Sequence, residues 1–121
     1  MIHTSNDRRF LFKAHRGGKS VIIAEIVRRA TVLKHNRVLF FVHRKELIEQ
    51  IKQDLIKNDC DMQLVDLITE QSLVNKVHKH RNFPKYQLII TDEAHHSLAK
   101  GYQEIYQAFP KAMLVVFSTT P

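Results

Sequence analysis

Apolar residues along this chain form two kinds of pattern, short continuous runs and longer stretches with helical spacing. Residues 38–42 (Val-Leu-Phe-Phe-Val) are all apolar, which is typical of a strand buried on both faces of a parallel sheet. Similar short runs predict further strands at residues 9–14, 63–68, 88–90 and 113–117. Apolar positions recurring every three or four residues predict helices over 19–33, 45–57, 71–79 and 98–109.

Strands that alternate with helices predict one α/β domain over residues 1–121, with a mainly parallel sheet. In such a sheet the loops that follow the strands meet at one edge, where ligands bind. Polar segments follow the predicted strands at residues 15–20, 43–44, 69, 92–93 and 118–120. We therefore expect a functional site at the carboxyl edge of the sheet.

The charge of the chain is unevenly distributed. The formal net charge is +7, and residues 1–60 alone hold 13 Lys+Arg against six Asp+Glu. Such a one-sided basic excess favours a polyanionic partner, either nucleic acid or nucleotide. No apolar run approaches the ~20 residues that cross a bilayer, so we expect no membrane partner. A lone cysteine, Cys60, fits a reducing, cytoplasmic location.

Gly17-Gly18-Lys19-Ser20 stands between a predicted strand and a predicted helix, as a phosphate-binding loop does. Glycines let backbone N–H groups approach phosphate oxygens, and the helix N-terminus adds partial positive charge. Lys19 would reach the β- and γ-phosphates, and the Ser20 hydroxyl would bind Mg²⁺. The full pattern has a glycine six residues before the lysine, where this chain has Lys13. A glycine turn that merely opens a helix is therefore the alternative interpretation.

Two adjacent carboxylates, Asp92 and Glu93, follow the predicted strand at residues 88–90. Carboxylates in this position hold Mg²⁺ and orient water in enzymes that cleave phosphate bonds. Asp92 would bind the metal, directly or through water, and Glu93 would act as general base on the attacking water. An isolated Asp-Glu pair is more often a solvated helix start, but the upstream Gly-Gly-Lys-Ser segment favours the chemical role.

Five ordered segments give the chain a resemblance to the first RecA-like domain of superfamily-two DEAD/DEAH-box helicases and translocases. These segments are Lys19-Ser20 (motif I), 42–47 with Gln50 (motif Ia), 68–73 (a T-x-Q-S-L segment), Asp92-Glu93-Ala94-His95 (the DEAH box, motif II) and 118–121 (motif III). The resemblance covers nearly the whole chain and is closest to bacterial and phage-type helicases and restriction-type translocases. It implies a three-layer RecA-like P-loop NTPase domain.

The resemblance also implies cofactors and partners. The cofactors would be ATP and Mg²⁺, bound by Gly17, Gly18, Lys19, Ser20 and Asp92. The partner would be nucleic acid, with DNA favoured over RNA. A second RecA-like domain, in cis or in trans, would complete the ATP hydrolase.

Further residue roles follow from the same resemblance. Arg44, and with less support Thr69 and Gln71, would contact the phosphate backbone of one nucleic-acid strand, which positions the strand without reading its sequence. The alternative for Arg44 is a surface cation paired with Glu46 or Glu49.

The remaining roles concern catalysis and its coupling to nucleic acid. His95 would join Glu93 and Lys19 as a catalytic residue and hydrogen-bond with Ser118. Together with Thr119 and Thr120, Ser118 would relay the nucleotide state to the strand-binding surface. A polar residue without this role is the alternative for His95.

The chain departs from the family pattern in two respects. Either one residue is missing between the motif I glycines, or Arg16 occupies the position of the first glycine. Because loop length decides which N–H groups face the β-phosphate, we expect weak or absent ATP affinity in the isolated chain. Since the sequence given has no second RecA-like domain after Pro121, we expect this chain to supply no arginine finger in cis, a group worth roughly 10³–10⁵ in rate.

Three functional hypotheses remain open at this stage. The leading hypothesis is the ATP-binding domain of a helicase or translocase that is incomplete without its second domain. The second is a non-catalytic nucleic-acid-binding relic of such a helicase. The third is an unrelated P-loop enzyme such as a small-molecule kinase, which the matches to motifs Ia and III disfavour.

Overall fold

A computed structural model describes residues 2–3, 9–15, 18–92 and 99–120 of the chain. Its centre is a six-stranded sheet with the order β1-β2-β6-β5-β3-β4. The strands are β1 (Ile2–His3), β2 (Arg9–His15), β3 (Val38–Val42), β4 (Val65–Thr69), β5 (Leu88–Asp92) and β6 (Met113–Thr120). β1 pairs antiparallel with β2, and every other pairing is parallel.

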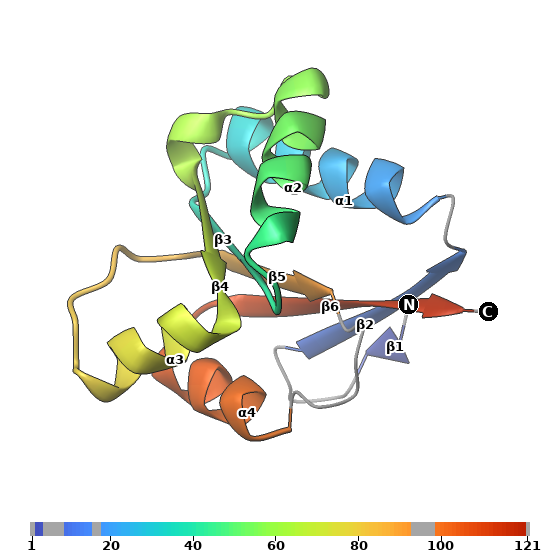
Figure 1. Cartoon of the computed structure of the whole chain (residues 1–121). Coiled ribbons are helices and arrows are strands. Elements are labelled where there is room, and N and C mark those ends of the chain that lie inside the picture. The colour runs from blue at the N-terminus through green and yellow to red at the C-terminus, as the bar shows by residue number, and fades with distance from the viewer. Residues whose placement is uncertain (1, 4–8, 16–17, 93–98, 121) are drawn as a thin grey trace.

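Helices cover both faces of the sheet and give the molecule three layers (Figure 1). One face carries α1 (Lys19–Arg28), which continues into a π-helical segment at Arg29–Leu33, and α2 (Glu46–Lys57). The other face carries α3 (Glu70–His78) and α4 (Ala99–Ala108). A short 3₁₀ segment, Met62–Leu64, leads into β4. The predicted α/β class with a mainly parallel sheet is confirmed.

The uniform apolar run of β3 has a structural reason. All five of its residues are buried. Phe40 packs into the apolar cluster between the sheet and the α1–α2 layer. Leu39 and Phe41 pack into a second cluster between the sheet and the α3–α4 layer. Because successive side chains of a strand point to opposite faces, a strand between two helical layers needs apolar residues at every position.

The structure differs from the predicted elements in several details. The helix predicted over 19–33 changes to π-helical geometry at Arg29, and the chain then turns at His35, which has a φ of 56°. Within this turn Asn36 N–H donates to Ala30 O at 2.8 Å. Strand β1 and the 62–64 segment were too short for a periodic signal. No helix in the described part of the chain has the length and apolar character needed to span a membrane.

Candidate functional site

The start of α1 offers backbone donors at the carboxyl edge of the sheet. Gly18 is the N-cap residue and, lacking a side chain, contributes no capping hydrogen bond. The N–H groups of a first helical turn have no partners within the helix and attract anions, with help from the helix dipole. Ile22 N–H closes the first turn on Gly18 O at 3.2 Å. Gly18, Lys19 and Ser20 therefore stand where a phosphate group would meet the helix.

Lys19 and Asp92 are in direct contact. Lys19 Nζ donates to Asp92 Oδ2 at 2.8 Å, and the two side chains are only 17% and 18% exposed. The second carboxylate oxygen, Asp92 Oδ1, is buried and has no hydrogen-bond partner in the part of the chain that the structure describes. The expected proximity of the lysine and the first carboxylate of the DEAH segment is thereby confirmed.

A cavity of about 300 Å³ opens beside this ion pair. Its wall combines the two charged residues with apolar side chains from β3 and the facing sides of α1 and α2. The lining residues are Lys19, Ser20, Ile23, Phe40, Val42, Leu47, Gln50, Ile51, Asp54, Leu55 and Asp92. A concave apolar site with a few convergent polar groups is the usual form of a small-molecule site.

Two polar residues of α2 line this cavity, although the sequence predicted no site role for either and identified Gln50 only as part of the motif Ia segment. Gln50 and Asp54 line the wall contributed by α2. They lie four positions apart, so they share one face of the helix, next to the apolar stripe that Leu47 and Ile51 form. A polar pair at helical spacing beside an apolar stripe is the signal that could have identified them.

The residues expected to contact nucleic acid lie on the same carboxyl edge but outside this cavity. Arg44 is exposed between β3 and α2, and the described residues show no ion pair with Glu46 or Glu49. Thr69 caps α3, because its hydroxyl oxygen accepts the N–H of Ser72 at 3.2 Å. Gln71 is exposed, and its Nε2 donates to Asn75 Oδ1 at 3.3 Å.

Six other predicted site residues fall into two groups, those outside the described residues and those described as backbone. Gly17, Glu93 and His95 lie outside the described residues. Ser118, Thr119 and Thr120 are described as backbone of β6, where they pair in register with Lys13, Ala14 and His15 of β2. This register brings the motif III segment to the strand end that precedes the phosphate-loop segment.

Two described histidines, His78 and His80, do not line the cavity beside Lys19 and Asp92. His78 is exposed at the end of α3, and its Nε2 lies 2.7 Å from Glu104 Oε2 of α4. His80 is also exposed and has a φ of 51°. His78 is the last residue of α3 and contacts α4, and His80 lies just beyond α3.

Solved structures with the same architecture define the class of domain. The UvsW helicase from bacteriophage T4 superposes with a TM-score of 0.68 at 18% sequence identity, over 94% of this chain and 47% of that one. The ATPase domain of the Thermus phage P74-26 large terminase gives a TM-score of 0.56 at 9% identity, over 94% and 60% of the two chains. At these identities the likeness concerns the fold, which is the RecA-like α/β fold.

Sequence relatives specify the family further. Residues 2–121 match the family described as the type III restriction enzyme, res subunit. The chain belongs to this family and is similar to the first domain of superfamily-two helicases.

Two curated relatives are much longer than this chain. A 51.5 kDa protein of a Lactococcus phage (isolate 7-9) is 43% identical over 104 residues, which cover 86% of this chain and 22% of that protein. IRC3 of Saccharomyces cerevisiae, whose description names an ATP-dependent helicase, is 34% identical over 114 residues. That match covers 77% of this chain and 16% of the yeast protein. The chain therefore spans less than a quarter of either relative.

Proposed function

We propose that this chain is the nucleotide-binding part of an ATP-dependent helicase or translocase, and that a second RecA-like domain completes its chemistry. The observation that carries the proposal is the Lys19–Asp92 contact of 2.8 Å in the wall of a cavity, with one buried carboxylate oxygen that has no hydrogen-bond partner among the described residues. A lysine and an acceptor-rich carboxylate at one sheet edge suit a metal-bound triphosphate.

The donor set at this edge fits Mg²⁺. Mg²⁺ takes oxygen ligands and is usually held by one or two protein groups, together with water and substrate phosphates. Asp92 Oδ1 is buried without a partner in the described part of the chain, and the exposed Ser20 lines the same cavity. Asp92 and Ser20 would hold the ion, directly or through water. When bound, Mg²⁺ neutralises charge on the phosphates and orients them.

The ion pair itself indicates how the site would accept a ligand. In the free chain Lys19 and Asp92 neutralise each other at a position that is mostly shielded from water. A triphosphate would offer Lys19 a new anionic partner, while the metal would offer Asp92 a new cation. Each of the two side chains therefore has an opposite charge beside it in both states, which lowers the cost of desolvating the site.

The other roles are proposed from the family resemblance and the position of each residue. Glu93, one residue beyond Asp92, would activate the attacking water, and His95 would assist it. Arg44 and Gln71, both exposed beyond strand ends, would contact nucleic-acid phosphates, with DNA the favoured partner. Ser118, Thr119 and Thr120 would couple the two sites through the end of β6.

Equilibrium titration of the 121-residue chain with Mg-ATP tests this proposal. We expect weak, Mg²⁺-dependent binding, which Lys19→Ala and Asp92→Asn each reduce at least about tenfold, or about 1.4 kcal/mol. Lys111→Ala and Asp59→Asn remove the same charges at exposed positions outside the cavity, and they should leave the affinity unchanged. Salt-dependent binding to single strands with no effect of Mg-ATP would instead identify a non-catalytic nucleic-acid-binding relic.

A further inference from the structure

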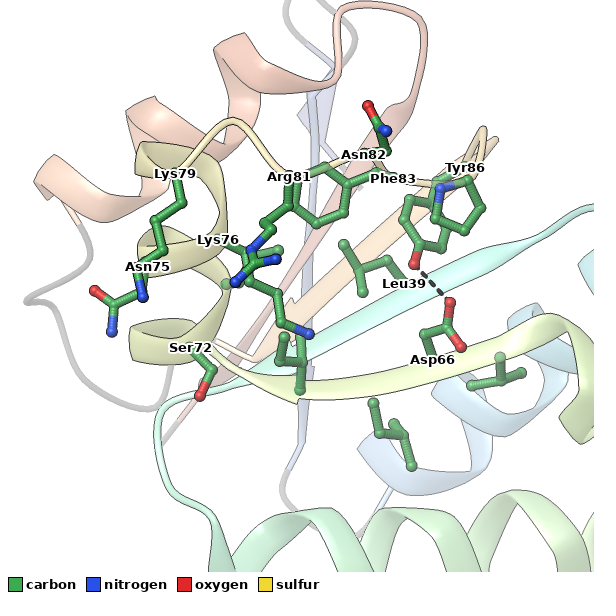
Figure 2. A pocket seen from close by; sticks show the side chains of 15 residues that line it. Leu39, Asp66, Ser72, Asn75, Lys76, Lys79, Arg81, Asn82, Phe83 and Tyr86 are labelled. Carbon is green, nitrogen blue, oxygen red and sulfur yellow. Dashed lines mark hydrogen bonds between the residues drawn. The ribbon is translucent and has the colours of Figure 1, made fainter.

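A second and larger cavity lies on the opposite face of the sheet. Its volume is about 750 Å³, and it opens between α3, the outer strand β4 and residues 81–86 (Figure 2). It shares no lining residue with the cavity beside Lys19 and Asp92. The nucleotide chemistry proposed above therefore leaves this groove unexplained.

One side of the groove is an open strand edge. β4 is the last strand in the sheet order and pairs with β3 alone among the described strands. Four consecutive β4 residues, 65–68, line the groove. An outer strand presents unpaired backbone N–H and C=O groups, which can bind a further strand.

Within the described residues, this edge lacks three features that commonly prevent strand addition. Outer strands are commonly blocked by lysine, proline or a bulge, but Val-Asp-Leu-Ile-Thr contains neither residue, and its register with β3 is continuous. Its single charge, Asp66, is already engaged, because Tyr86 Oη donates to Asp66 Oδ2 at 2.5 Å and Arg37 Nη1 lies 3.4 Å from the same oxygen. Figure 2 shows the Tyr86–Asp66 bond at one end of the groove.

The floor of the groove is apolar, whereas its rim is basic. Leu39 and Leu73, both buried, line it together with Ile68 and Phe83. Lys76, Lys79 and Arg81 contribute three cations to the lining, and none forms an ion pair with a carboxylate in the described part of the chain. Figure 2 shows Lys76 and Arg81 reaching into the space between α3 and β4.

We propose that this groove binds an extended acidic segment of a partner protein, which adds as a strand to the outer edge of β4. Its apolar side chains would pack on Leu39, Ile68 and Phe83, and its carboxylates would pair with Lys76 and Arg81. A second copy of this chain fits poorly, because it would bring the same cations to the contact and the chain already carries a net charge of +7. A nucleic-acid strand would leave the open backbone edge and the apolar floor unused.

Selection from a phage-displayed library of random ten-residue peptides on the 121-residue chain tests the proposal. We expect enrichment of peptides that alternate acidic and apolar residues. The K76E/R81E variant should bind them at least about tenfold more weakly, because it replaces two attractions with repulsions. The K52E/K57E variant carries the same charge change on exposed positions of α2 and should bind within about twofold of the original chain.

Three further measurements distinguish strand addition from general attraction of anions. Bound peptide should slow hydrogen exchange of backbone amides in residues 65–69, and an analogue N-methylated at alternate residues should lose binding. A single-stranded DNA oligonucleotide should not displace the peptide. The proposal is wrong if no acidic peptide is enriched, if K76E/R81E binds equally well, if the N-methylated analogue retains affinity, or if DNA competes fully.

Discussion

Lys19 Nζ, in the first residue of α1, lies 2.8 Å from Asp92 Oδ2, in the last residue of β5, although the two residues are 73 positions apart in the chain. The contact joins the phosphate-loop segment to the DEAH segment at the carboxyl edge of the sheet. It is largely shielded from solvent, so water and salt screen the attraction between the two charges only weakly.

A double-mutant cycle measures this contribution. Lys19→Ala and Asp92→Asn should show a coupling of about 1–3 kcal/mol in the free energy of unfolding, because each single change removes the attraction between these two shielded charges. Urea unfolding at neutral pH provides the measurement. The exposed Glu25–Arg29 pair, 2.7 Å apart where α1 continues into the π-helical segment, serves as the control and should couple more weakly. Additive effects of Lys19→Ala and Asp92→Asn would contradict the prediction.

Glu70, the first residue of α3 on the opposite face of the sheet, should make the stability of the folded chain depend on pH. Its Oε1 is buried without a hydrogen-bond partner among the described residues, and burial raises the pKa of its carboxyl group. An acid whose pKa is raised by folding binds more protons in the folded chain, so stability falls as pH rises from the unfolded pKa through the folded one.

Glu70→Gln should therefore raise the free energy of unfolding at pH 7, by less than about 1 kcal/mol after solvent screening. The gain should vanish below about pH 4, where the carboxyl group is protonated in both states. Urea unfolding across this range is the measurement. Glu49→Gln is a matched control, since Glu49 occupies the first turn of α2 and is exposed. A gain that does not depend on pH would exclude the proposed cause.

Gly101 lies against the same carboxylate. A Cβ atom at this position would stand 2.6 Å from Glu70 Oε2 and 3.3 Å from Val74 Cγ2. Alanine favours a helix over glycine by about 1 kcal/mol, but the Glu70 side chain must first move away. Gly101→Ala should therefore change stability little in the original chain and raise it by about 0.5–1 kcal/mol in a Glu70→Ala background. Thermal unfolding of both pairs tests this, and equal effects in the two backgrounds would contradict it.

We expect ionisation of the Tyr86 phenol to lower the stability of the folded chain at alkaline pH. Burial and the hydrogen bond to Asp66 raise the pKa of this phenol. A group with a raised folded pKa contributes its full stability below the unfolded pKa, which is about 10 for tyrosine, and loses it as pH rises toward the folded value.

Tyr86→Phe should consequently lower the free energy of unfolding by about 1 kcal/mol at pH 8, through loss of the hydrogen bond. The difference between the two chains should then shrink above pH 10, as folding opposes ionisation of Tyr86. Urea unfolding at pH 8 to 11 follows both effects. A difference that stays constant over this range would show that Tyr86 ionises equally well in the folded chain.

Local patterns were sufficient to predict most elements of the fold. The run at 38–42 predicted β3 with its observed limits, and the helix predicted at 45–57 differs from α2 by one residue. The π-helical turn after Arg28 could not be predicted, because it leaves the apolar spacing of residues 19–33 nearly unchanged. It is accompanied by the Thr31 hydroxyl, which donates to Val27 O at 2.8 Å, a contact that periodicity does not encode.

The candidate site was predictable only in part. Lys19, Ser20 and Asp92 belong to short motifs whose residue types and spacing indicate phosphate and metal chemistry. Gln50 belongs to the motif Ia segment, but neither Gln50 nor Asp54 could be assigned to the cavity in this way, because their position in its wall depends on how α2 packs beside α1. The groove along β4 could likewise not be predicted from the sequence, since its lining comes from three separate segments of the chain.

The amino-acid sequence by itself determined the order of strands and helices, the basic first half and the chemical character of the two strand-end motifs. These properties depend on residue types and on spacings of a few positions, which are fixed before the chain folds. Only the tertiary structure decided that Lys19 meets Asp92, that β4 forms the outer edge, and that Lys76 and Arg81 face that edge. Strand order and helix packing follow from burial of apolar surface summed over the whole chain, and no local window contains that sum.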